Sequence, residues 1–131
     1  MKDLYLIGAG GFTIEVLFLI DRFHKNCWNN IYIIDDDLEK IGTKVRGVDV
    51  VSNINDFTVK CKSEQDIEKD VIIAINNPKI RSCIVEKFLE EKIKINFPNL
   101  MDGTFIFDKE YSTIGKGNII MDFVGITGNV S

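Results

Sequence analysis

Short apolar runs alternate with longer amphipathic stretches along the first hundred positions of the chain. The clearest runs are Leu4–Ile7, Ile31–Ile34 and residues 71–75. Runs of this length are typical of strands buried on both faces of a parallel sheet. Between the first two runs, residues 12–23 are apolar over most of a helical surface. The pattern therefore predicts a strand, a helix and a parallel strand, which together form a right-handed βαβ unit.

Weaker patterns predict the elements between the second and third runs. Residues 47–51 are consistent with a short strand, and residues 52–57 with a brief helix that Ser52 would cap. Residues 60–70 are mostly polar and charged, so we interpret them as a solvated helix or loop.

A further helix is predicted after residues 71–75, because an asparagine cap and Pro78 favour a helix start. Five apolar residues recur there at helical spacing and predict one buried face: Ile80, Ile84, Val85, Phe88 and Leu89. This spacing leaves Arg81 on the exposed face. Residues 94–97 predict a last short strand before Pro98.

The composition of the sequence changes after Pro98, where β-branched residues, glycine and asparagine replace helix-forming residues. Ile114, Ile120 and Ile126 follow at six-residue spacing, which is typical of a left-handed β-helix. A β-hairpin with evenly placed isoleucines is the alternative. We therefore expect two domains, an α/β domain over residues 1–98 and the first β-helix coil over residues 99–131.

Charge and composition exclude several classes of function. The 131 residues carry 20 acidic and 16 basic side chains and a net charge of −4, which disfavours a nucleic-acid partner. The apolar stretch 16–20 is far shorter than the roughly 20 residues of a membrane span, and the amino terminus lacks a signal-peptide pattern. We expect a cytoplasmic protein. The three cysteines lack CxxC spacing, so no metal site is predicted.

The glycine-rich segment between the first strand and the first helix is the strongest candidate for chemistry. Glycines at positions 8, 10 and 11 permit positive φ and close approach of a ligand to the backbone. The following helix directs N–H groups and its positive dipole end at the loop, which suits a phosphate. A dinucleotide fingerprint needs a third glycine where this chain has Thr13, so the motif favours phosphate over NAD. The alternative is a tight turn needed only for packing.

Polar residues follow the other predicted strands at the same edge of the sheet. Asp35 and Asp36 lie where an acidic side chain accepts hydrogen bonds from a ribose or a base. Asn76, Asn77 and Arg81 follow residues 71–75, and Arg81 could pair with a phosphate or a sugar acid. A solvated aspartate turn and an exposed helix arginine are the alternatives. The predicted binding residues are Gly8, Ala9, Gly10, Gly11, Phe12, Asp35, Asp36, Asn76, Asn77 and Arg81. No catalytic triad can be assembled.

An ordered series of motifs resembles the sialic-acid O-acetyltransferase and bacillosamine N-acetyltransferase family of sugar acyltransferases. The series begins with Lys2-Asp3-Leu4-Tyr5-Leu6-Ile7-Gly8-Ala9-Gly10-Gly11-Phe12, then Glu15-Val16. It continues with Ile33-Ile34-Asp35-Asp36-Asp37, Ile73-Ala74-Ile75-Asn76-Asn77-Pro78 with Arg81, Phe97-Pro98-Asn99-Leu100 and Ile114-Gly115-Lys116-Gly117-Asn118-Ile119-Ile120. The resemblance implies a Rossmann-like domain that holds a nucleotide-sugar, commonly a UDP-sugar. It also implies a trimeric left-handed β-helix that binds acetyl-CoA between subunits, with a histidine as general base.

This chain departs from the family pattern in two respects: its single histidine is His24, in the first domain, and it stops at Ser131, in what resembles the second coil, where the family continues for several more. We therefore expect a fragment of a longer enzyme, or a degenerate paralogue, that transfers no acetyl group alone and is a monomer or weak oligomer. The predicted function is the nucleotide-sugar-binding part of a sugar O- or N-acetyltransferase in surface-glycan synthesis. A non-catalytic nucleotide-sugar sensor is the alternative. An NAD-dependent oxidoreductase is disfavoured by Thr13 and by the lack of a YxxxK pair.

Overall fold

A six-stranded sheet forms the centre of the structure, a computed structural model that describes residues 2–23, 25–101 and 104–106. The strands are β1 (Leu4–Ile7), β2 (Ile31–Ile34), β3 (Lys44–Val45), β4 (Val48–Ser52), β5 (Lys69–Ile73) and β6 (Ile95–Asn96). They lie in the order β3-β4-β2-β1-β5-β6. All neighbouring strands are parallel except β3 and β4, which form an antiparallel hairpin.

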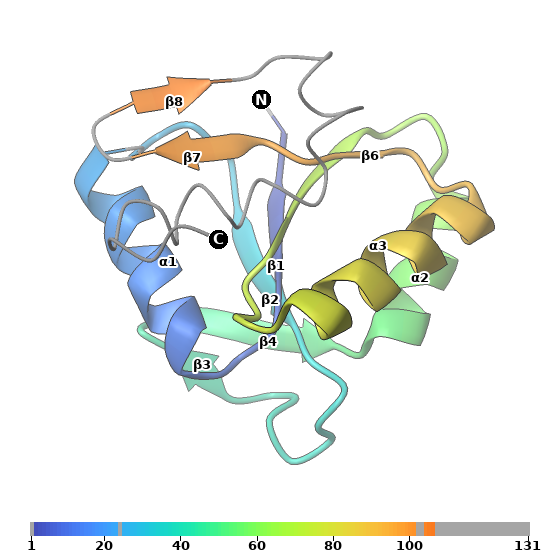
Figure 1. Cartoon of the computed structure of the whole chain (residues 1–131), viewed down its shortest axis with the longest axis horizontal. Coiled ribbons are helices and arrows are strands. Elements are labelled where there is room, and N and C mark those ends of the chain that lie inside the picture. Colours follow the sequence, from blue (N-terminus) through green and yellow to red (C-terminus); the bar gives the residue numbers. More distant parts are fainter. Residues whose placement is uncertain (1, 24, 102–103, 107–131) are drawn as a thin grey trace.

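Three helices cover the two faces of this sheet: α1 (Gly11–Phe23), α2 (Ile54–Ser63) and α3 (Pro78–Glu91). The crossover through α1 runs from β1 toward β2, whereas those through α2 and α3 run in the opposite direction across the sheet. Right-handed crossovers therefore place α1 on one face and the other two helices on the opposite face. Figure 1 shows α2 and α3 side by side, with α1 across the sheet from them.

The core consists of the central strands and the helix faces that cover them. All four residues of β1 and all five of β5 are buried. On the α2 and α3 face, the ring of Phe57 lies 4.8 Å from that of Tyr5 and 5.9 Å from that of Phe88. On the other face α1 buries Val16, Leu17 and Ile20. The Rossmann-like fold predicted from the sequence is therefore confirmed.

The region before β5 differs from its predicted form. Helix α2 extends to Ser63, and its cap is Asn53 rather than Ser52, because the Asn53 side chain accepts the N–H of Asp56. Strand β5 begins at Lys69, so residues 69 and 70 are buried instead of solvated. These charges are tolerated inside because each has a partner. The Lys69 ammonium pairs with Glu64 at 3.1 Å, and Asp70 accepts the indole N–H of Trp28 at 2.8 Å.

The buried face of α3 also differs from the predicted one. Arg81 is only 4% exposed and lies with Ile84, Val85 and Phe88 on the buried face. Ile80 and Leu89 are about half exposed, at 46% and 49%. The buried face of α3 is therefore rotated slightly from the face that the apolar residues predicted. The expectation that Arg81 is solvated is wrong. Helix α1 likewise leaves Ile14 and Phe18 partly exposed.

After β6, the chain forms a short antiparallel pair from β7 (Asn99–Met101) and β8 (Thr104–Ile106). The evenly spaced isoleucines Ile114, Ile120 and Ile126 lie outside the described residues. The β-helix coil and the domain boundary at residue 98 therefore stay predictions.

Candidate functional site

The glycine loop joins β1 to α1 at the carboxyl edge of the sheet, along the lower side of Figure 1. Gly8 has φ of +113°, and its N–H donates to Ile34 O on β2 at 2.7 Å. A Cβ at this position would lie 2.8 Å from Ile75 Cγ1 and 3.0 Å from Ala74 O. Gly8 is therefore required by the fold, because it lets the loop pass close to the end of β5.

Thr13 closes the loop from the helix side, although it is not among the binding residues predicted from the sequence. It is fully buried, and its hydroxyl donates to Gly8 O at 2.5 Å. Its N–H donates to Gly10 O at 3.1 Å. The residue that breaks the dinucleotide fingerprint thus fixes the turn through its hydroxyl. A small β-branched residue with an oxygen, in the first turn of the helix, is the signal that could have identified it.

Gly10 and Gly11 differ from Gly8 because the protein itself leaves room above them. Both are exposed, and a Cβ built on either meets no atom within 4 Å. Helix α1 begins at Gly11, and the first N–H groups of a helix have no partner within it. Open space, backbone N–H groups and the positive end of a 13-residue helix therefore meet at one place, which is suited to an anion.

The two aspartates after β2 hold backbone groups of neighbouring segments. Asp35 accepts the N–H of Ala9 through Oδ2 at 2.8 Å and that of Asp37 through Oδ1 at 2.7 Å. Asp36 Oδ1 accepts the N–H of Ile54, at the start of α2, at 2.8 Å. Asp35 is half-buried and fastens the glycine loop to β2, whereas Asp36 is exposed and keeps its second oxygen outside these bonds. Asp36 is thus the better placed of the two to receive a ligand.

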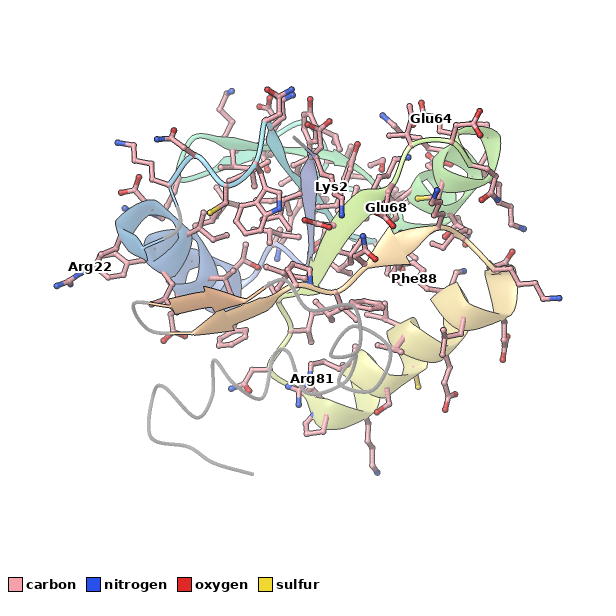
Figure 2. The ribbon with its side chains drawn as sticks, turned by 90° about the horizontal axis from the view of Figure 1, so that it is seen from above. Lys2, Arg22, Glu64, Glu68, Arg81 and Phe88 are labelled. Atoms are coloured by element: carbon pink, nitrogen blue, oxygen red, sulfur yellow. The ribbon has the colours of Figure 1, made fainter. Side chains whose placement is uncertain are left out.

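Three predicted residues follow β5. Asn77 caps α3, because its side-chain oxygen accepts the N–H groups of Lys79 and Ile80 at 3.0 and 3.2 Å. Asn76 is exposed. Arg81 lies at the start of α3 (Figure 2), and its Nη1 donates to Ile75 O at 3.3 Å. Burial lowers the pKa of the Arg81 guanidinium from its ordinary value.

The structure brings most of these predicted residues to one edge. Asp35 contacts Ala9, Gly8 lies against Ile75, and Arg81 bonds the carbonyl of Ile75. This edge lies between β1 and β5, where the chain connections leave in opposite directions, and ligands of open α/β sheets bind at such a switch point. Two hollows, one beside α1 and one around Lys2, contain no residue of the glycine loop.

Within the residues that the structure describes, no group of three or more histidine, cysteine, aspartate or glutamate side chains could hold a metal ion. No helix among these residues has the length and apolar character needed to cross a membrane.

Comparisons with known proteins agree on the fold. Residues 3–88 match the family model described as the PglD N-terminal domain. A UDP-D-quinovosamine 4-dehydrogenase from Vibrio fischeri superposes with a TM-score of 0.52 at 17% identity, covering 90% of this chain and 88% of that chain. A mutant of perosamine N-acetyltransferase from Caulobacter crescentus, in complex with CoA and GDP-perosamine, superposes with a TM-score of 0.56 at 21% identity. That match covers 77% of this chain and 43% of the transferase. The comparison with curated proteins gave no match.

Proposed function

Because this chain belongs to the PglD N-terminal domain family, we propose that it binds a nucleotide-sugar at the glycine-loop edge as part of a sugar acetyltransferase. The family match covers β1 through most of α3, and every proposed binding residue lies within it. The observation that carries the proposal is the open space over Gly10 and Gly11 at the start of α1. A diphosphate fits there, because backbone N–H groups and the helix dipole both favour negative charge.

Each residue has a distinct role in this proposal. The segment from Gly8 to Phe12 receives the diphosphate, and Asp35 holds that segment in place through Ala9. Asp36 uses its second oxygen for a hydroxyl of the ribose or an N–H of the base. Asn76 is the polar group offered by the neighbouring strand end, and Asn77 and Arg81 shape the start of α3.

Acetyl-CoA would supply the acetyl group in the complete enzyme. The resemblance puts its binding groove between β-helices, so no described residue of this chain is assigned to it. The perosamine N-acetyltransferase was solved with both CoA and GDP-perosamine, which supports the use of CoA together with a nucleotide-sugar in the proposed enzyme. A cytoplasmic location and activity in surface-glycan synthesis belong to the same proposal.

Calorimetric titration with UDP, GDP, UDP-N-acetylglucosamine and NAD tests the binding site. We expect a uridine nucleotide to bind and NAD not to bind. Gly10→Val should abolish binding while leaving the melting temperature within a few degrees, because its side chain would enter the proposed phosphate space, where a Cβ meets no protein atom within 4 Å.

The matched control is Gln65→Val, which puts the same side chain on an exposed residue after α2, at the opposite edge of the sheet. This variant should bind like the unmodified chain. Binding of NAD without any uridine or guanosine nucleotide would overturn the proposal and favour an oxidoreductase. Retained nucleotide affinity in Gly10→Val would show that the ligand sits elsewhere.

A further inference from the structure

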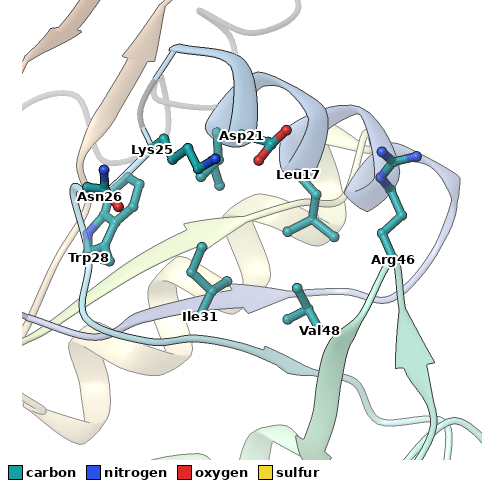
Figure 3. Close-up of a pocket in the computed structure, with 9 residues that line it drawn as sticks. Leu17, Asp21, Lys25, Asn26, Trp28, Ile31, Arg46 and Val48 are labelled. Atoms are coloured by element: carbon teal, nitrogen blue, oxygen red, sulfur yellow. The ribbon is translucent and has the colours of Figure 1, made fainter.

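A second hollow lies on the α1 face of the sheet, away from the glycine loop. It is partly open to solvent, has a volume of about 300 Å³ and lies between the second half of α1 and the first residues of β2 and β4. In Figure 3 the side chains of Leu17, Ile31 and Val48 converge on this space from α1 and from the two strands. The inner wall of the hollow is therefore apolar.

The hollow exists because one crossover lacks a helix. In a doubly wound fold, the connection between two parallel strands normally carries a helix. The connection from β2 to β4 continues in the direction set by α1, so its helix would lie beside α1 on the same face. Here residues 35–43 make turns and lead into the hairpin strand β3, and no helix forms between Ile34 and Lys44. The surface beside α1 is left uncovered.

Charged side chains surround the mouth of the hollow. Lys25, after α1, and Arg46, in the β3–β4 turn, stand at opposite ends of it, with Asp21 between them (Figure 3). None of the described residues forms an ion pair or hydrogen bond with the side chain of any of these three. Two cations against one carboxylate give a local charge of +1 in a chain whose net charge is −4. The mouth therefore favours an anion.

The size of the hollow suits a small ligand. The volume lies at the lower end of the range of ligand pockets, roughly 300–1,000 Å³. From the apolar wall, the cationic mouth and this volume, we propose that the hollow binds a small organic anion with a branched aliphatic body. The carboxylate would face the cationic mouth.

This proposal does not rest on the nucleotide site, and its test has its own signal. Trp28 lines the hollow and is the single tryptophan of the chain, so its fluorescence reports binding directly. We would titrate the full chain with 4-methylpentanoate, its neutral isostere 4-methylpentanamide and the cation 3-methylbutylamine. The carboxylate should change the fluorescence saturably, in the millimolar range. The amide and the amine should each bind at least about fivefold more weakly, since each lacks the paired charge.

Variants separate a specific site from nonspecific attraction. The double change Lys25→Gln with Arg46→Gln should weaken binding of 4-methylpentanoate at least about fivefold. Lys79→Gln, an exposed lysine on α3 and so across the sheet, is the matched control and should leave the affinity unchanged. Equal affinity for the carboxylate and the amide, an unchanged affinity in the double variant, or no saturable signal from the carboxylate would each overturn the proposal.

Discussion

Gly8 and Gly10 are two residues apart in one loop, yet the structure assigns them different constraints. Gly8 combines a φ of +113° with a Cβ direction that points into Ile75 and Ala74. Gly10 has neither constraint. Gly8→Ala should therefore lower the free energy of unfolding by about 1–3 kcal/mol, because the change adds backbone strain and overpacking.

Gly10→Ala should change the free energy of unfolding by less than about 0.5 kcal/mol. Urea denaturation followed by Trp28 fluorescence measures both variants. Equal losses would contradict the different roles of the two glycines. A large loss in Gly10→Ala alone would mean that the loop conformation depends on Gly10.

Asp70 is a buried carboxyl group whose charge weakens the fold. Burial raises the pKa of Asp70 above its ordinary value of 3.8, although the Trp28 indole N–H and the Lys2 ammonium oppose this shift. Because the pKa of Asp70 is higher in the folded state than in the unfolded state, the protonated carboxyl contributes its full stabilisation at pH values below the unfolded-state pKa. This contribution is lost as pH rises through the folded-state pKa. The acidic range just above 3.8 is therefore where stability should respond to this residue.

Asp70→Asn cannot ionise and keeps an oxygen for the Trp28 N–H, so its stability relative to the unmodified chain should rise with pH through this range. The difference should then stay constant toward neutral pH. Urea denaturation at a series of pH values from 3.5 upward measures it. Asp49→Asn, at an exposed ion pair with Lys44, is the control for the change in charge alone. A difference that falls as pH rises would show that the Lys2 pair outweighs burial.

At the scale of elements, two neighbouring asparagines have different roles: Asn77 caps a helix, and Asn76 is a candidate ligand contact. Asn77 accepts two N–H groups at the start of α3. Asn77→Ala should therefore lower the free energy of unfolding by about 1 kcal/mol, and Asn77→Ser should restore most of the loss. Asn76→Ala should leave stability unchanged, and it should weaken UDP binding if the proposed site is correct. Chemical denaturation and calorimetry on the same preparations give both results.

The elements that the sequence predicted well are those whose periodicity is strong. Strands β1 and β2 and the start of α3 were predicted at their observed positions, because apolar runs and the Asn-Pro signal are local. Lys69 and Asp70 were interpreted as solvated because their partners, Glu64 and Trp28, lie on other elements. Arg81 was misplaced for a similar reason, since only the folded chain brings the Ile75 carbonyl to its guanidinium. The two-residue strand β3 is too short to leave a pattern.

The same contrast applies to the candidate site. The glycine loop, Asp35 and Asp36 could be found from their positions after buried strands, because parallel strands end at one edge. The role of Asp35 could not be predicted from the sequence, since its hydrogen bond to Ala9 joins residues 26 positions apart. Thr13 was recognised only as a departure from a motif, whereas its hydroxyl holds the loop.

At the scale of the whole molecule, strand order decides where a ligand can bind, whereas the available side chains decide what chemistry the chain can perform. The switch between β1 and β5 lies at the proposed binding edge, and a separate hollow lies on one face, where a crossover helix is missing. Acetyl transfer to a sugar needs in addition a general base within hydrogen-bond reach of the acceptor, with a pKa near the working pH. His24, the single histidine, lies within the family-matched segment at residues 3–88. No predicted nucleotide contact lies near it in the sequence.

We therefore expect this 131-residue chain to transfer no acetyl group from acetyl-CoA to a UDP-amino sugar, even where it binds the nucleotide. The assay should detect the acetylated sugar by mass spectrometry. Thiol reagents would also react with the exposed Cys83 and obscure release of CoA. A perosamine N-acetyltransferase with its own substrate serves as the positive control for the assay. Sugar-dependent acetylation that persists in His24→Ala would contradict the expectation, because it would require a base that the sequence does not reveal.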